Sequence, residues 1–453
     1  MPVGYGPDRR QRWSVLSDAL RTQLWPLPAA GVALAIGLGV ALPRLDAALA
    51  GRLPATFTAF LFSGGPEAAR TVLSVIAGSL ITVTSLTFSL TVVTLQLASS
   101  QFSPRLLRTF TQDRFVHGTL ALLLATFTYA VTVLRTVRAS LDSQAAFVPH
   151  MSVTVAYVLG LASVLGLVLF LAHLARQIRV ESMMRAVHAE TTATIRRVLP
   201  DGTDHEHQPP VPPPTAVRLC AAASGFLTFV DEKALLTAAA DADAAILLDR
   251  LPGDSIIAGT PIAAAWAVGG GALEKPVVEA LAPRVAAAVR VGFERTAAQD
   301  VAFGLRQLVD VAVKALSPGI NDPTTAISAL GHLAALLCEA AGHDLGPRVV
   351  HDEAGKACVM LQRPDLAVLL ELAVAQPRRY GRADPDVLAR LLTLLREVAW
   401  HTRTTAQRGA VEEQLQRLQA TIDEQRFDDA ERGRLDALAR TVPAALVRQW
   451  PAS

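Results

Sequence analysis

The stretch TVLSVIAGSLITVTSLTFSLTVVTLQLASSQFSP, residues 71–104, decides the fold of this chain. It contains no charged residue, although it carries many hydroxyl side chains. As one helix, its 34 residues would extend about 50 Å, which exceeds the roughly 30 Å hydrocarbon core of a bilayer. The stretch therefore predicts a membrane-spanning helix that tilts strongly, breaks or projects beyond the membrane.

The hydroxyl groups of this stretch form two stripes. At about 100° per residue, the wider stripe covers roughly a third of the helix circumference, and a narrower stripe lies on the far side. Lipid offers no partner to a polar face, so the wider stripe is expected to face protein, or water held by protein. Helix packing and a path lined by water or ions both remain open. The wider stripe comprises Ser74, Gly78, Thr82, Ser85, Ser89, Gln96, Ser99, Ser100 and Ser103; the narrower one comprises Thr84, Thr87, Thr91 and Thr94.

The composition of the whole chain also indicates a membrane protein. Hydrophobic residues make up 51% of it and charged residues 18%, and the hydrophobicity is concentrated before residue 173. A net charge of +2, with no basic patch interleaved with aromatics, argues against a nucleic-acid partner. Cys220, Cys338 and Cys358 lack CxxC spacing, which argues against a disulfide framework or a zinc site and fits a reducing cytoplasm.

Four membrane-spanning helices are predicted, at residues 27–42, 71–104, 115–134 and 147–171. Arginines are concentrated in the N-terminal segment, between the second and third spans, and after the fourth. With four spans these three places lie on one side of the membrane, and the excess of positive charge makes that side cytoplasmic. Both termini are therefore expected in the cytoplasm.

The chain after the fourth span is predicted to be a soluble domain, mostly helical and of the α+β class. Residues 217–267 alternate short apolar runs with turn signals, which predicts strands there, including 245–250 and 261–268, with a helix at 232–242 between early strands. A hairpin is expected at 348–350 and 357–361, and everything else is expected to be helical. The predicted domains are an amphipathic segment at 1–24, a four-helix membrane domain at 25–186, a helix exit and Pro-rich linker at 187–214, a small α/β subdomain at 215–272 and a mainly helical domain at 273–453.

One segment of the soluble part is dense in polar side chains that could cap helices or bind a ligand. Asp322 is predicted to cap a helix that begins at Pro323, and Gly319 to end the preceding helix. Arg295 would pair with Asp300 or Asp322. The alternative is a ligand or ion site at a helix N-terminus, supported by Arg295. The candidate residues of this polar cluster are Glu294, Arg295, Gln299, Asp300, Asn321 and Asp322.

Two motifs are specific enough to compare with known families. The first is AGSLITVTSLTFSLTVVTLQLASSQFSPRLLRTFTQDR, residues 77–114, together with TFTYAVTVLRTVR, residues 126–138. The second is FERTAAQDVAFGLRQLVDVAVKALSPGINDPTTA, residues 293–326. Both resemble the signatures of a bacterial family of predicted membrane proteins, domain of unknown function 2254. The resemblance implies an N-terminal membrane part and a C-terminal soluble part, located in the bacterial inner membrane, and implies no activity.

The function predicted from the sequence is an oligomeric channel or transporter-like pore. GxSxG, HExxH, a Walker loop and a dinucleotide fingerprint are absent, so no catalytic residue, metal site or cofactor is predicted. Four helices are few to enclose a pore, so several copies of this chain are expected to form it together. The expected partners are therefore lipid and further copies of this chain. The alternative is a membrane-anchored cytoplasmic regulatory or scaffold protein. The candidate lining residues are Thr82, Ser85, Ser89, Gln96 and Ser100, with Arg105 and Arg108 at the cytoplasmic mouth.

Overall fold

The computed structural model divides the chain into two compact units. Unit 1 is Met1–Arg179 and unit 2 is Val180–Ser453. All of the residues predicted as a helix exit and linker, 187–214, therefore belong to unit 2. The structure describes residues 25–49, 61–101, 113–138, 147–177, 179–200, 211–352, 355 and 358–450.

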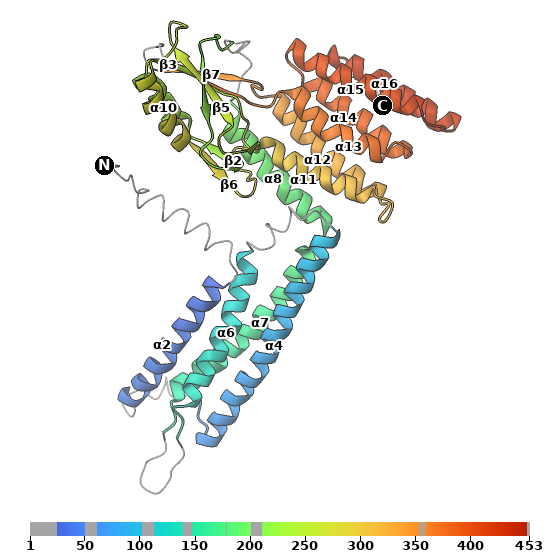
Figure 1. Ribbon diagram of the computed structural model, residues 1–453. Coiled ribbons are helices and arrows are strands. Elements are labelled where there is room, and N and C mark those ends of the chain that lie inside the picture. Colours follow the sequence, from blue (N-terminus) through green and yellow to red (C-terminus); the bar gives the residue numbers. More distant parts are fainter. Residues whose placement is uncertain are drawn as a thin grey trace. The chain divides into compact units, whose positions relative to one another are not determined.

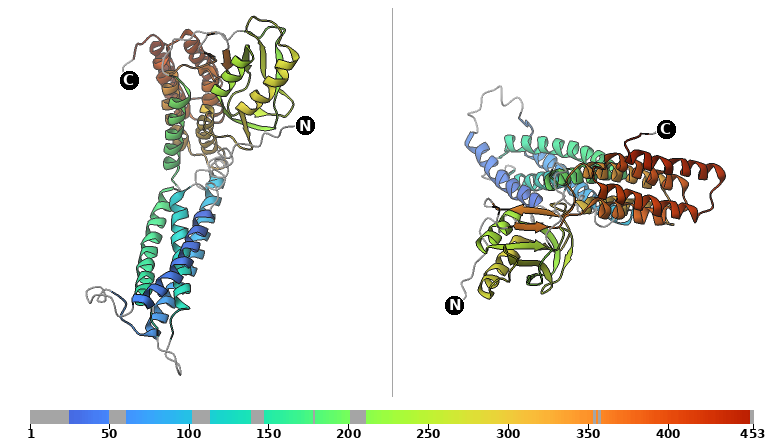
Figure 2. Two further views of the ribbon diagram at one scale, coloured as in Figure 1. Left: turned by 90° about the vertical axis from the view of Figure 1, so that its left-hand side faces the viewer. Right: turned by 90° about the horizontal axis from the view of Figure 1, so that it is seen from above.

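Unit 1 is a group of four long helices in its described residues. They are α2 (Pro26–Leu49), α4 (Pro66–Gln101), α6 (Arg114–Leu134) and α7 (His150–Gln177). Figures 1 and 2 show them running alongside one another, and α6 contacts each of the other three. Residues 71–101 of the uncharged stretch lie in α4, which is one helix, so the stretch does not break within the described residues.

Small residues let α2 approach α6 closely. A Cβ atom added at Gly39 would lie 2.8 Å from the side chain of Thr132, and one added at Gly31 would lie 3.2 Å from the carbonyl oxygen of Ala121. Ala35 is buried between these glycines. Such small-residue faces allow close helix contact in membranes, where lipid gives helices no hydrophobic reason to associate.

Near the C-terminal end of α2, Asp46 caps the N-terminus of α7. Its carboxylate oxygens accept hydrogen bonds from the backbone nitrogens of Met151 and Ser152, at 3.0 and 2.9 Å, and from the Ser152 hydroxyl at 2.7 Å. The first backbone N–H groups of a helix have no partner within the helix, so this carboxylate satisfies donors that would otherwise be left unpaired.

Unit 2 contains two sheets. The larger has the strand order β1 (Val217–Cys220), β5 (Pro261–Ala267), β3 (Ala244–Leu248), β8 (Cys358–Leu361) and β7 (Arg348–His351). Its strands pair antiparallel except β3 and β8, which are parallel. The smaller sheet has the order β4 (Ser255–Ile256), β2 (Gly225–Val230) and β6 (Val289–Gly292). The helices α9 (Glu232–Asp241) and α10 (Lys275–Ala288) share one apolar core with these strands.

The remaining regular elements in the described part of unit 2 are helices. In Figure 1 the sheets and α10 lie on one side of this unit, and the C-terminal helices lie on the other. Leucine-rich faces of α11, α12 and α14 form much of the buried interior. These helices are α8 (Val180–Val198), α11 (Val301–Ala315), α12 (Pro323–Ala341), α13 (Leu366–Tyr380), α14 (Pro385–His401), α15 (Thr405–Asp423) and α16 (Asp429–Leu446).

Comparison with the expected elements shows agreement and three differences. The strands predicted at 245–250 and 261–268 and the hairpin at 348–361 are present as β3, β5, β7 and β8, but the hairpin extends the larger sheet. The expectation that residues after 272 outside the hairpin are all helical is wrong, because β6 pairs with β2. A fifth helix, α12, is also long and apolar enough to cross a membrane by length and composition. It packs against α8, α11, α13 and α14 within unit 2.

Candidate functional site

The wider polar stripe of α4 faces away from its own helix group. Thr82, Ser85, Ser89 and Gln96 are all exposed in unit 1. The side chain of Ser100 and the residues Arg105 and Arg108 lie outside the described part of the chain. Packing within unit 1 therefore does not account for these four positions of the stripe.

The narrower stripe has the opposite orientation. Thr84, Thr87, Thr91 and Thr94 are buried. Each hydroxyl donates a hydrogen bond to the carbonyl oxygen four residues earlier, at 2.6 to 2.8 Å. Threonine can satisfy its hydroxyl in this way while its methyl group packs against a neighbour. The packing interpretation thus holds for the narrower stripe.

Exposed apolar side chains border the wider stripe on both sides. At about 100° per residue, Ile81 and Phe88 lie on one side of it, and Leu86 and Val93 lie on the other. All four are exposed, with Leu86 at 60% and Phe88 at 55%. The outward face of α4 is therefore a polar centre between two apolar margins.

In unit 2, Arg295 pairs with Asp300 rather than with Asp322. The Oδ2 atom of Asp300 accepts hydrogen bonds from Nε and Nη2 of Arg295 at 2.9 and 2.6 Å, and Oδ1 caps α11 by accepting from the Phe303 nitrogen at 3.0 Å. The Asp300 side chain is 2% exposed. Burial raises the pKa of Asp300, and the charge and hydrogen bonds of Arg295 oppose that shift.

Gln299 joins the same region to the smaller sheet. Its Oε1 accepts a hydrogen bond from the Val230 nitrogen at 2.7 Å, and its Nε2 donates to the Val230 carbonyl at 3.0 Å. The side-chain amide thus pairs with the last residue of β2 as a neighbouring strand would.

The polar residues predicted as one cluster are separated along α11. Arg295, Gln299 and Asp300 lie at its N-terminal end, whereas Asn321 and Asp322 follow its C-terminal end, roughly 22 Å away at 1.5 Å per residue. Glu294 is exposed near the first group.

The turn between α11 and α12 is held by Asn321 and Asp322. Asn321 has a φ of 51°, a left-handed conformation that asparagine adopts more readily than most residues. The prediction that Gly319 ends α11 is wrong: Leu316 is the C-cap, and Gly319 has no positive φ. Asp322 caps α12 as expected, accepting hydrogen bonds from the Thr325 nitrogen at 3.0 Å and its hydroxyl at 2.5 Å.

Asp322→Ala is expected to lower the free energy of unfolding by about 1 kcal/mol, because it removes the cap of α12. The hydrogen bonds from Thr325 hold the pKa of Asp322 below its ordinary value. The folded state thus favours the carboxylate, so the contribution is present at neutral pH and is lost as the pH falls through the lowered pKa. Thermal unfolding of the purified chain measures the loss. Asp322→Asn keeps a capping oxygen and is expected to lose less; equal losses would contradict the capping role.

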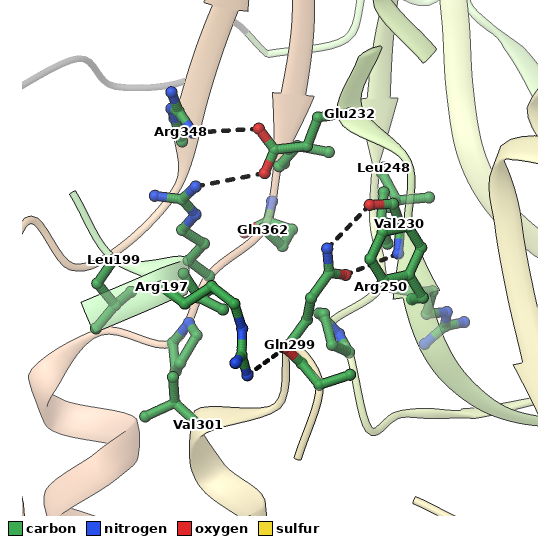
Figure 3. Close-up of a pocket in the computed structure, with 17 residues that line it drawn as sticks. Arg197, Leu199, Val230, Glu232, Leu248, Arg250, Gln299, Val301, Arg348 and Gln362 are labelled. Carbon is green, nitrogen blue, oxygen red and sulfur yellow. Dashed lines mark hydrogen bonds and ion pairs between the residues drawn. The ribbon is translucent and has the colours of Figure 1, made fainter. Parts of the chain in front are cut away.

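Gln299 also lines a pocket within unit 2, with a cavity volume of about 370 Å³. Figure 3 shows Arg348 beside Glu232 on one side of it and Arg250 on the other. Four arginines and one carboxylate are the charged side chains among the described residues that line it. They are Arg197, Arg250, Arg348, Arg363 and Glu232.

Sheet register explains why three of these arginines line one pocket. Leu248 of β3 pairs with Leu361 of β8, and the two strands are parallel, so both strands end at the same edge of the sheet. Arg250 and Arg363 each come two residues after these paired leucines. Arg348 begins β7 directly opposite Leu361. Ligands of open α/β sheets bind outside the carboxyl ends of parallel strands, where such side chains converge. Sequence patterns did not single out these arginines, because they gave no indication that β3 pairs with β8.

The arginines differ in how their charge is compensated. Arg348 and Arg363 approach separate oxygens of Glu232, at 3.1 and 3.5 Å. Arg197 donates to the carbonyl oxygens of Ala297 and Ala298. Burial, followed by the charge of Arg348, lowers the pKa of Arg363. For metals, no group of three or more His, Cys, Asp or Glu side chains suited to hold an ion occurs among the residues that the structure describes.

These features define a class of protein: a membrane protein with an N-terminal set of long apolar helices and a C-terminal unit of helices and sheets. The chain belongs to the family described as "Predicted membrane protein (DUF2254)", whose model matches residues 21–397, and the resemblance noted from its motifs is confirmed. An uncharacterized protein of Mycobacterium tuberculosis is 37% identical over 437 residues, covering 95% of this chain and 82% of that protein. An uncharacterized protein of Mycobacterium bovis shows the same values. No solved structure matches the chain.

Proposed function

We propose that this protein is an oligomeric channel or transporter-like pore of the bacterial inner membrane, lined by the outward face of α4. In this proposal α2, α4, α6 and α7 cross the membrane, α12 is an interior helix of unit 2, and both termini are cytoplasmic. One observation carries the proposal: Thr82, Ser85, Ser89 and Gln96 are exposed on unit 1, whereas the threonines of the opposite stripe are buried.

Physical reasoning supports an oligomer. Hydroxyl and amide groups facing hydrocarbon lose their hydrogen bonds with water, so this face needs a protein or water environment that unit 1 alone does not supply. Closed rotational symmetry would place one α4 from each copy around a common axis. The apolar margins at Leu86, Phe88 and Val93 would then contact neighbouring copies or lipid, and the polar centre would line the axis.

Ser85→Leu and Ser89→Leu are expected to reduce potassium or chloride efflux from liposomes containing the protein by at least about tenfold, because each places a bulky apolar side chain in the polar path. Val93→Leu adds bulk on the apolar margin and serves as the matched control, with efflux expected to stay near the wild-type rate. The measurement is ion-selective electrode recording on vesicles with equal protein content.

Two outcomes would count against the pore. Efflux unchanged in both serine variants would assign the stripe to packing between copies, and a monomeric particle in lipid nanodiscs would remove the shared axis. The second candidate function, a membrane-anchored regulatory protein, is favoured by a separate observation, the arginine-lined pocket in unit 2. A monomer with no efflux and a ligand in that pocket would support it.

A further inference from the structure

We propose that the pocket at the shared edge of β3, β7 and β8 binds a small organic phosphate. This inference concerns unit 2 alone and does not depend on the pore. It names a ligand site and a ligand class: a molecule with a phosphate group for the arginines and an apolar or planar body for the rest of the lining.

The first argument is uncompensated positive charge. Glu232 is shared between Arg348 and Arg363, so one carboxylate faces two guanidinium groups. Arg250 has no hydrogen-bond or ion-pair partner in the described part of the chain. Positive charges held together in a partly enclosed space repel one another, and an anion relieves that repulsion.

The second, independent argument is an unsatisfied buried donor. The side chain of Arg363 is 6% exposed, and its Nη1 is buried without a hydrogen-bond partner among the described residues. Guanidinium groups carry five N–H donors, and a buried donor without an acceptor is costly, so most buried donors in native proteins are paired. A phosphate oxygen, reached by a small rotation of the guanidinium, would supply the missing acceptor.

Phosphate suits this arrangement because of its geometry. It presents several oxygens, and arginine binds phosphate through paired N–H groups in a planar fork. Arg348 and Arg363 both approach Glu232, so their guanidinium groups lie close enough together for one tetrahedral anion to contact both. Arg250 lines the other side of the pocket and adds positive charge there.

The remaining lining and the volume indicate the rest of the ligand. A cavity of about 370 Å³ is within the usual range for small-molecule sites. Its uncharged walls are mostly apolar, with Gln299 and Gln362 as polar exceptions. The apolar lining includes Leu199, Phe229, Leu248 and Leu361.

The test is isothermal titration of the detergent-purified full chain with AMP and phenyl phosphate, and with adenosine as the uncharged analogue of AMP. At least one phosphate is expected to bind with a dissociation constant below about 1 mM, and adenosine at least about tenfold more weakly than AMP. Arg250→Gln removes an arginine without an ion pair, so the protein is expected to fold normally and to bind the phosphate about tenfold more weakly.

Arg218→Gln is the matched control, since it makes the same change at an exposed position of β1 outside the pocket. The affinity of the Arg218→Gln variant for the phosphate is expected to equal that of the wild type. The proposal is overturned if neither phosphate binds, if adenosine binds as well as AMP, or if both arginine variants weaken binding equally. Should Arg250→Gln fail to fold, Arg348→Gln replaces it, with the same expected loss of affinity and the same control.

Discussion

Gly253→Ala is expected to destabilise unit 2 by about 3–5 kcal/mol, because its new methyl group would break a buried ion pair. A Cβ at this position would lie 2.1 Å from Oδ2 of Asp300 and 2.7 Å from Nη2 of Arg295. Those two atoms are themselves 2.6 Å apart, so the methyl group cannot enter without separating them. The φ of 97° at Gly253 adds backbone strain for any residue with a side chain.

Gly259→Ala separates these two effects. Gly259 also has a positive φ, 80°, but a Cβ there would meet nothing within 4 Å. This control is expected to cost about 1–2 kcal/mol from backbone strain alone. Thermal unfolding of both purified variants, followed by near-ultraviolet circular dichroism, compares them. Equal losses of unfolding free energy in the two variants would show that separating Arg295 from Asp300 does not destabilise unit 2.

Arg295→Gln is expected to cost about 3–5 kcal/mol at neutral pH, since it leaves the buried carboxylate of Asp300 without its cation. The matched control is Arg284→Gln. Arg284 pairs with Asp241 at 2.7 Å, but the two side chains are 43% and 59% exposed. Exposed pairs contribute about 0–1 kcal/mol, so the control is expected to unfold close to the wild type.

The loss in Arg295→Gln is also expected to depend on pH. Burial raises the pKa of Asp300, and removing Arg295 removes the opposing influence, so the folded variant holds a proton more tightly than the unfolded chain does. A group of this kind favours folding as the pH falls through its raised pKa. The stability gap between variant and wild type is therefore expected to narrow between neutral pH and about pH 5. A gap that stays constant over this range, or one as small as that of Arg284→Gln, would contradict the buried-pair account.

Local sequence patterns predicted the elements whose signals are local. The apolar run of α4 and the Asp322 cap both depend on residues that are neighbours in sequence. β6 was missed because Val289–Gly292 is only four residues long and directly follows the Ala-rich helix α10, so no alternation could develop. The left-handed position in this turn belongs to Asn321 and not to Gly319. The sequence could not show this, because both residue types permit a left-handed conformation.

The polar face of α4 and the pocket show what sequence patterns left open. Helical periodicity separated the two stripes of α4, but it could not say which one the other helices cover. The pocket arginines lie on separate elements, from Arg197 of α8 to Arg363 after β8. The parallel pairing of β3 with β8 brings Arg250 and Arg363 to one edge, and that pairing joins strands more than 100 residues apart. No local signal carries information over that distance.

Asp46 has a consequence for the biogenesis of unit 1. Its hydrogen-bond partners Met151 and Ser152 follow it by 105 and 106 positions. A ribosome adds about 5–20 residues per second, so the carboxylate must wait on the order of 5–20 s for them to be synthesised. The carboxylate of Asp46 therefore gains these partners only after the start of α7 has been synthesised, and a nascent chain stalled before His150 would present an unsatisfied carboxylate to the insertion machinery.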